Sequence, residues 1–259
     1  MNTPTARPAR PASPSVATGI APSATSALAG SDFLRLLAAW GLAAPAAAPG
    51  GFGQRLSEWF SWTDAIALSG ALGGPAEPVP AGLLTAAERL AVETRELARV
   101  RQQLLGHIRG EPAGARSRPA ARVAVSPRVQ ARLAAEHLGD EGFAPHRQRC
   151  LAVHKAMDNA IGALRQRVRD AVAAASPALA HLATLDVVME DVVGGRERAL
   201  LAQVPGLLAQ RYERLQAEDA EHLTPRFQRE LQQLLEAELD FRLHPVEGLL
   251  DALRQAATH

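Results

Sequence analysis

Cysteine, lysine and aromatic residues are all scarce in this sequence of 259 residues. The single cysteine, Cys150, cannot form an intramolecular disulfide, so the fold does not need an oxidising compartment and a cytoplasmic location is expected. No run approaches the roughly 18 consecutive apolar residues that span a bilayer, so no membrane span is predicted. Residues 1–30 lack the apolar centre of a secretion signal and are predicted to form a disordered tail.

Strand patterns are missing as well. No window of useful length alternates apolar and polar residues with period two or gathers β-branched residues, whereas long stretches carry helical spacing. The predicted fold class is therefore all-α, an elongated antiparallel helical bundle with a long heptad-patterned central helix. Its expected parts are the disordered tail (1–30), an N-terminal helical region with a Trp-rich helix (31–110), an Arg/Pro-rich linker (111–125) and a C-terminal helical bundle (126–259).

Capping residues and heptad spacing mark the first helices. Ser31 precedes an apolar run, and Thr85 with Glu88 forms a capping box. Further on, apolar or seam positions alternate steps of four and three residues over about four heptads, which predicts one long helix with a continuous seam. The seam positions are Phe143, Arg147, Cys150, His154, Met157, Ile161, Leu164, Val168 and Ala171.

Glycine and proline set the expected boundaries in the last third of the chain. Gly194 and Gly195 are predicted to break a helix and permit a reversal, and Pro205 to kink or break the next one. The predicted starts of helices are Ser176 with Pro177, Thr224 with Pro225, and Pro245.

Residues 55–72, RLSEWFSWTDAIALSGAL, hold two of the three tryptophans. Trp59, Phe60 and Trp62 lie within four positions, and aromatic side chains of this size bury about 150–250 Å² each. This helix must therefore insert into the main bundle or into another chain. A core anchor is the expected role of these aromatic residues, and the alternative is that Trp59, Phe60 and Trp62 are partner-binding residues.

Cys150, His154 and Asp158 superficially resemble a catalytic thiol, base and acid. Their spacing of four residues aligns the side chains in parallel along one helix, so they do not converge on a substrate. Cys150 and His154 also lie on the predicted buried seam. We therefore expect no catalytic residue, no enzyme activity and no small-molecule substrate.

Two carboxylate–histidine pairs have the spacing of a metal clip, namely Glu218 with His222 and Asp240 with His244. A structural metal site needs about four converging ligands, and these pairs are scattered. No metal and no cofactor is predicted, and solvated helix surface is the expected role of both pairs.

Arg165, Arg167 and Arg169 lie beside the seam and are candidate phosphate or ion-pair contacts. Neither an aromatic platform nor a glycine-rich phosphate loop accompanies them, so ion pairing on the helix surface is expected and nonspecific nucleic-acid binding is the alternative. Asp186 and Glu190, four positions apart, are expected at the surface or as partners of Arg165 or Arg169 across a turn.

A net charge of +1 conceals an uneven distribution. Residues 1–185 carry 20 basic and 13 acidic side chains, and residues 186–259 carry 8 and 14, which gives +7 and −6. Two solvated surfaces of opposite sign are the expected meaning. Whether these halves meet within one chain or between two chains is left open by the sequence.

Three segments in this order resemble an uncharacterised proteobacterial family, the domain of unknown function 3348. They are RLSEWFSWTDAIALSGAL, LRQRVRDAVAAASPALAHLATLDVVMED and RERALLAQVPGLLAQRYERL, within roughly residues 31–220. The family has no assigned activity, so the resemblance implies no catalytic residue. It implies an accessory role beside an envelope-associated complex. We therefore predict a non-enzymatic helical scaffold or accessory protein that binds a protein partner or associates with itself.

Overall fold

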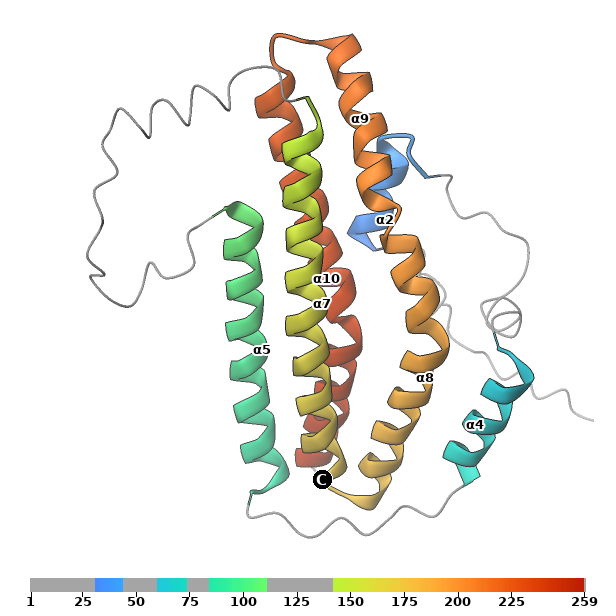
Figure 1. Ribbon diagram of the computed structural model, residues 1–259. Helices are drawn as coiled ribbons and strands as arrows, with labels where there is room; N and C mark the ends of the chain where they lie inside the picture. The colour runs from blue at the N-terminus through green and yellow to red at the C-terminus, as the bar shows by residue number, and fades with distance from the viewer. Residues whose placement is uncertain (1–30, 44–59, 74–83, 111–141, 259) are drawn as a thin grey trace, which may run out of the picture.

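The computed structural model describes residues 31–43, 60–73, 84–110 and 142–258, and every regular element in these ranges is a helix. The predicted all-α class and elongated helical bundle are confirmed (Figure 1). Trp59 and the segments 1–30 and 111–125 lie outside the described residues. The helices are α2 (Asp32–Ala39), α4 (Trp62–Gly73), α5 (Ala86–Arg109), α7 (Ala144–Ala173), α8 (Pro177–Leu201), α9 (Val204–Glu218) and α10 (Leu223–Ala257).

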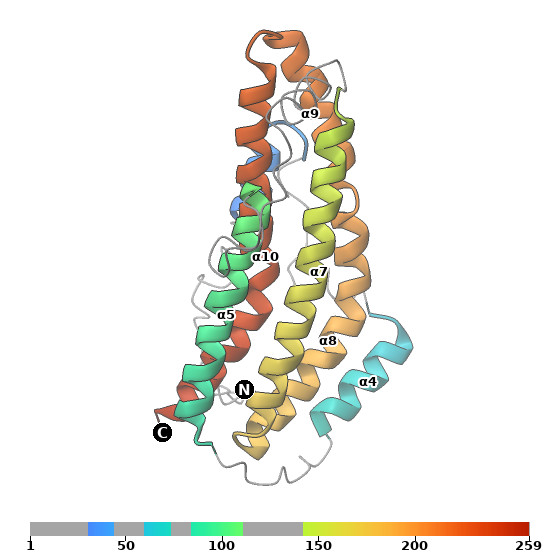
Figure 2. The same ribbon diagram turned by 60° about the vertical axis from the view of Figure 1, so that its left-hand side comes forward.

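Four long helices, α5, α7, α8 and α10, lie lengthwise against one another, and α9 extends the line of α8 (Figures 1 and 2). Helix α7 runs antiparallel to α5 and α8, whereas α7 and α10 run parallel to each other. Helix α2 packs against α10, and α4 lies outside the bundle against α8 (Figure 2).

The helix starts predicted at Ser31, Thr85 and Ser176 are confirmed. The Leu34 amide donates to Ser31 Oγ over 3.3 Å, and the Leu179 amide donates to Ser176 Oγ over 3.2 Å. At the start of α5, Thr85 and Glu88 form the reciprocal capping box. These caps satisfy amide donors that the first turn of a helix leaves without backbone partners.

The predicted seam becomes the inner face of α7. Seven of its nine positions, from Cys150 to Ala171, are buried, and the partly buried Phe143 packs against the same core. Arg147, in the first turn of α7, is exposed, so its inclusion in the seam is wrong. The start of α7 extends beyond the end of α5, where fewer helices cover it (Figure 1). The seam packs against Leu104 and Ile108 of α5 and against the leucine-rich face of α10.

The break predicted at Gly194 and Gly195 is wrong, because α8 continues through both residues to Leu201. Each glycine costs a helix interior about 1 kcal/mol relative to alanine. Contact with α7 on one side and α4 on the other outweighs that local preference. The break at Pro205 is confirmed, since α8 ends before Ala202 and α9 begins at Val204.

The two helices predicted after residue 223 are one helix of 35 residues, α10. Pro245 lies inside it, and the helix begins at Leu223 with no side-chain cap from Thr224. An internal proline costs about 3 kcal/mol. The buried residues on both sides of Pro245 stabilise the continuous helix, and they include Leu243, Val246, Leu249 and Leu250.

Side chains from the two oppositely charged halves of the sequence contact each other within this one chain. Arg101 of α5 contacts Asp240 and lies 3.5 Å from Glu247, both on α10. Arg109 lies 3.3 Å from Glu236 in the same interface. These ion pairs connect helices that are distant in the sequence.

Candidate functional site

Helix α4 is the most apolar exposed element among the described residues. It begins after Ser61, whose amide donates to Asp64 Oδ2 over 2.8 Å while the Asp64 amide donates to Ser61 Oγ over 3.2 Å. The Ser61 hydroxyl also donates to Asp64 Oδ2, over 2.7 Å, and this bond, followed by the one from the Ser61 amide, holds the pKa of the Asp64 carboxyl below its usual value. Asp64 is the only charged residue in the helix.

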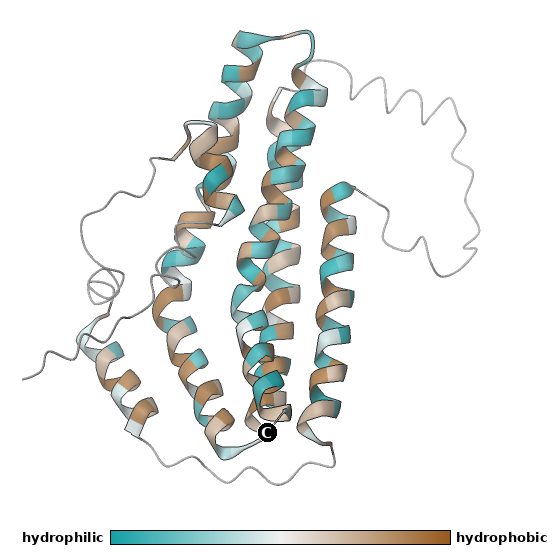
Figure 3. Cartoon of the chain, turned by 180° about the vertical axis from the view of Figure 1, so that it is seen from behind, coloured by the Kyte–Doolittle hydropathy of each residue, from teal (hydrophilic) through white to brown (hydrophobic). Residues whose placement is uncertain are grey.

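Three of the exposed side chains of α4 are large and apolar. Trp62 is 80% exposed, Ile66 56% and Leu72 59%, and no residue of α4 is buried. Figure 3 shows apolar colours along most of α4, on the outer flank of the bundle. A helix that is apolar on all sides is typical of a buried element, yet among the described helices α8 is the main one that packs against α4.

The three predicted aromatic residues have different positions. Trp62 projects from the first turn of α4, Phe60 is half-buried just before the helix, and Trp59 lies outside the described residues. The expected role of a core anchor is therefore wrong for Trp62, which lies outside the core of the described bundle. Its role in partner binding stays a prediction.

The arginines beside the seam contact carboxylates on neighbouring helices. Arg165 donates to both oxygens of Asp186, over 2.9 and 2.7 Å, and Arg169 donates to Asp186 over 2.6 Å and also contacts Glu190. Burial raises the pKa of the Asp186 carboxyl, but the two guanidiniums outweigh it and leave the pKa below its usual value. These bonds connect α7 to α8 across their turn.

Arg167 points to the opposite side, where its Nε donates to Glu93 Oε2 over 2.7 Å. Glu93 is a buried residue of α5. The three arginines therefore do not form one patch: Arg165 and Arg169 join α7 to α8, and Arg167 joins α7 to α5.

Cys150 and His154 take part in a buried polar chain that continues onto α10. His154 Nε2 lies 3.6 Å from Cys150 Sγ and 2.9 Å from Glu238 Oε2. The other carboxylate oxygen of Glu238 accepts from Arg242 Nε over 2.8 Å, and Arg242 also contacts Asp158. Asp158 thus belongs to the chain, but Arg242 and Glu238 separate it from the imidazole.

The geometry of this chain opposes nucleophilic catalysis by the thiol. In a thiol–imidazole–carboxylate triad the two partners contact different ring nitrogens, whereas here Cys150 and Glu238 both approach Nε2. Burial, together with the Glu238 carboxylate, raises the pKa of Cys150 to about 12. The thiol is fully buried, so it stays protonated and is inaccessible to a substrate.

The predicted carboxylate–histidine pairs do not converge with further ligands. His222 Nδ1 lies 3.2 Å from Asp219, Glu218 lies 3.4 Å from Arg226, and Asp240 contacts Arg101. Within the described ranges, no group of three or more histidine, cysteine or carboxylate side chains is arranged to hold a metal ion.

The sequence analysis did not predict a role for Glu238 or Arg242. The available signal was a charged residue among leucines: Glu238 follows Leu234 and Leu235 and precedes Leu239, all fully buried. A carboxylate on such a face requires a polar partner. That the partner would be His154 could not be predicted, because it depends on the parallel register of α7 and α10.

Fold and sites together define the class of this protein. It is a helical bundle whose interhelical charges contact one another and whose helix α4 presents apolar side chains to the outside. No helix in the described ranges is long and apolar enough to cross a membrane.

The sequence profile of one family, described as "Protein of unknown function (DUF3348)", matches residues 21–255. Because the match covers most of the chain, the protein belongs to this family, as the sequence resemblance predicted. No curated protein and no solved structure matches the chain.

Proposed function

We propose that this protein is a non-enzymatic cytoplasmic helical scaffold or accessory protein, and that it binds a protein partner through the outward face of α4. The observation that carries the proposal is the 80% exposure of Trp62 on a helix with no buried residue. Aromatic residues are enriched in the buried centres of protein interfaces. A partner that covers this face would remove Trp62, Ile66 and Leu72 from water together.

The polar interior also supports a structural role. In the described part of the chain, every buried side-chain nitrogen and oxygen has a hydrogen-bond partner. The members of the Cys150–His154–Glu238–Arg242–Asp158 chain contact one another in this way. Such a network stabilises one packing arrangement of the helices.

Nucleic acid is the alternative partner that the sequence suggested. Arg165 and Arg169 contact Asp186 and Glu190, and Arg167 contacts Glu93. These carboxylates partly neutralise the positive charge that the arginines could offer to phosphates. A protein partner on α4 is therefore the function that we favour.

A capture experiment with matched variants tests the proposal. The intact protein, Trp62→Ala and Ser69→Ala are each used to isolate partners, and the complex is then rebuilt from purified components. Truncation of a central interface tryptophan costs about 2 kcal/mol or more, so we expect Trp62→Ala to weaken the complex at least about thirtyfold. Ser69 is exposed on the same helix, and its replacement should leave the affinity unchanged.

Light scattering during size-exclusion chromatography separates a foreign partner from a second copy of the chain. A dimer that Trp62→Ala dissociates would identify the partner as a second copy. A strict monomer that forms no complex, or a complex that both variants retain equally, would contradict the proposal.

A further inference from the structure

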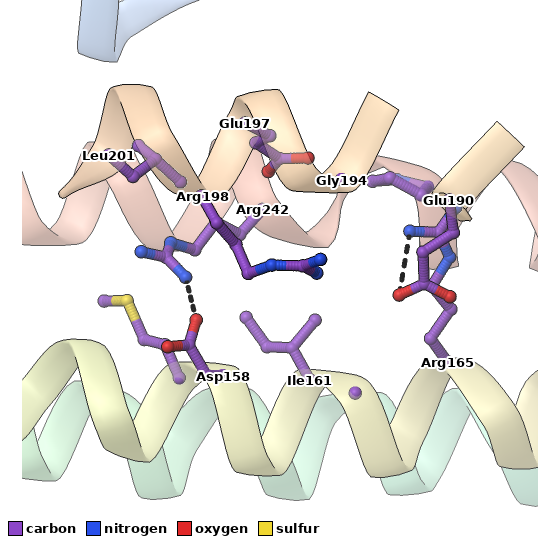
Figure 4. Close-up of a pocket in the computed structure, with 12 residues that line it drawn as sticks. Asp158, Ile161, Arg165, Glu190, Gly194, Glu197, Arg198, Leu201 and Arg242 are labelled. Atoms are coloured by element: carbon purple, nitrogen blue, oxygen red, sulfur yellow. Dashed lines mark hydrogen bonds and ion pairs between the residues drawn. The ribbon is translucent and has the colours of Figure 1, made fainter. Parts of the chain in front are cut away.

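A small pocket lies between α7, α8 and α10, away from α4. Its volume is about 190 Å³. Its charged lining consists of three arginines and three carboxylates, namely Arg165, Arg198, Arg242, Asp158, Glu190 and Glu197. Figure 4 shows these side chains, apart from that of Glu197, in the space between α7 and α8.

Two of the three guanidiniums are already held by carboxylates. Arg165 binds Asp186, and Arg242 lies 2.6 Å from Glu238 and also contacts Asp158. The ends of the pocket are therefore formed by ion pairs that fix the position of their side chains.

Arg198 is different. Among the described residues, no carboxylate lies within ion-pair distance of its guanidinium. Figure 4 shows this group between α8 and α7, above Ile161, whereas Glu197 lies beside α8. The middle of the pocket thus holds an exposed guanidinium that makes no carboxylate contact within the described residues.

Gly194 creates the space that this guanidinium occupies. A Cβ at position 194 would lie 3.3 Å from Arg198 Nη1 and 3.6 Å from Glu190 Cγ, so an alanine there would displace the end of Arg198. A Cβ on the next residue, Gly195, would meet nothing within 4 Å. Glycine weakens the interior of a helix, and α8 does not use Gly194 to end or turn. Room for the Arg198 guanidinium is a physical reason for a glycine there.

The rest of the lining indicates the kind of ligand. Met157, Ile161 and Leu201 supply apolar surface beside the guanidinium. Arg198 contributes one positive charge that contacts no carboxylate, and carboxylates surround the other two arginines, so a group with a single negative charge suits the site better than a dianion. An arginine binds a carboxylate through two parallel hydrogen bonds. We propose that the pocket binds a small organic carboxylate, with its charged group on Arg198 and its apolar part on Met157, Ile161 and Leu201.

Titration of the full chain with benzoate tests this proposal, followed through the methyl NMR signals of Ile161 and Met157. Benzamide serves as the uncharged control ligand and inorganic phosphate as the dianion. We expect saturable shifts of both methyl groups with benzoate, and at least tenfold weaker binding of benzamide and phosphate.

Four variants locate the charge that binds benzoate. Arg198→Gln should weaken binding at least tenfold, whereas Arg254→Gln, which makes the same charge change at an exposed position of α10, should not alter it. Gly194→Ala should weaken binding severalfold and Gly195→Ala should not. Both alanines should raise the melting temperature by about 2–4 °C, because alanine favours a helix.

A higher melting temperature shows that the glycine variants are folded, so a loss of benzoate binding can be distinguished from unfolding. Loss of benzoate binding in Arg198→Gln and Gly194→Ala alone would support the site. Absence of methyl shifts at saturating benzoate, equal binding of phosphate, or unchanged affinity of Arg198→Gln would overturn it. None of these results depends on the α4 partner.

Discussion

Glu238 provides the sharpest test of how the bundle is stabilised. Its side chain is fully buried, and its carboxylate contacts His154 on α7 and Arg242 on α10. Glu238→Gln keeps the shape of the side chain but removes the charge. The exchange leaves the Arg242 guanidinium, which is about 10% exposed, with only the Asp158 carboxylate as a charged partner.

The expected cost follows from the burial of the charges. Removal of one partner from a buried ion pair typically destabilises a protein by about 3–5 kcal/mol, because the remaining charge is uncompensated. Asp158 still contacts Arg242 in the variant, so the lower end, about 3 kcal/mol, is expected. With a urea dependence of about 2–3 kcal/mol per molar, the unfolding midpoint should fall by about 1–1.5 M.

Urea unfolding followed by circular dichroism measures this change, with Glu236→Gln as the matched control. Glu236 is two residues away and partly exposed, and its contact with Arg109 spans 3.3 Å. An exposed ion pair contributes about 0–1 kcal/mol, so the control should lose no more than that. Equal losses in the two variants, or a loss below about 1 kcal/mol for Glu238→Gln, would refute the reasoning.

Three further predictions concern titration. The pKa of Cys150, about 12, lies above the pKa of a thiol in the unfolded chain. The free energy of unfolding should therefore fall above about pH 9, by up to about 1.4 kcal/mol per pH unit. Cys150→Ala should remove this part of the slope. The pKa of Asp186 is lowered in the folded protein, so the stability that its carboxylate contributes is present above the unfolded pKa of about 3.9 and is lost as the pH falls below it. Asp186→Asn should therefore flatten the acid limb of a plot of unfolding free energy against pH. Burial lowers the pKa of His146, so the free energy of unfolding should decrease as the pH falls below about 6.5. NMR should show the His146 ring titrating below that pH, and titration at the ordinary value would contradict this.

Much of the fold could be predicted because it depends on local pattern. The heptad spacing located the buried face of α7, and the hydroxyl caps at Ser31, Thr85 and Ser176 marked three helix starts. Pro245 and the glycines of α8 misled the prediction, because the preference of a single residue was outweighed by burial of its neighbours.

The sites were less predictable because they depend on contacts between distant segments. The sequence suggested Asp186 and Glu190 as partners for Arg165 or Arg169, since only a turn separates their helices. It could not pair His154 with Glu238, 84 positions away, or place Arg198 beside Ile161. Nor could it show that α4 contacts α8 with its outer face exposed.

The partner-binding face of α4 is the central claim, and site-specific photocrosslinking in cells tests it most directly. Benzoylphenylalanine replaces Ala65, an exposed residue one turn from Trp62, or Gln102, an exposed residue of α5. Position 65 should give one defined crosslinked species, which Trp62→Ala in the same chain abolishes, and position 102 should give none. Identical crosslinks from both positions, or none from position 65, would contradict the assignment of α4 as the binding surface.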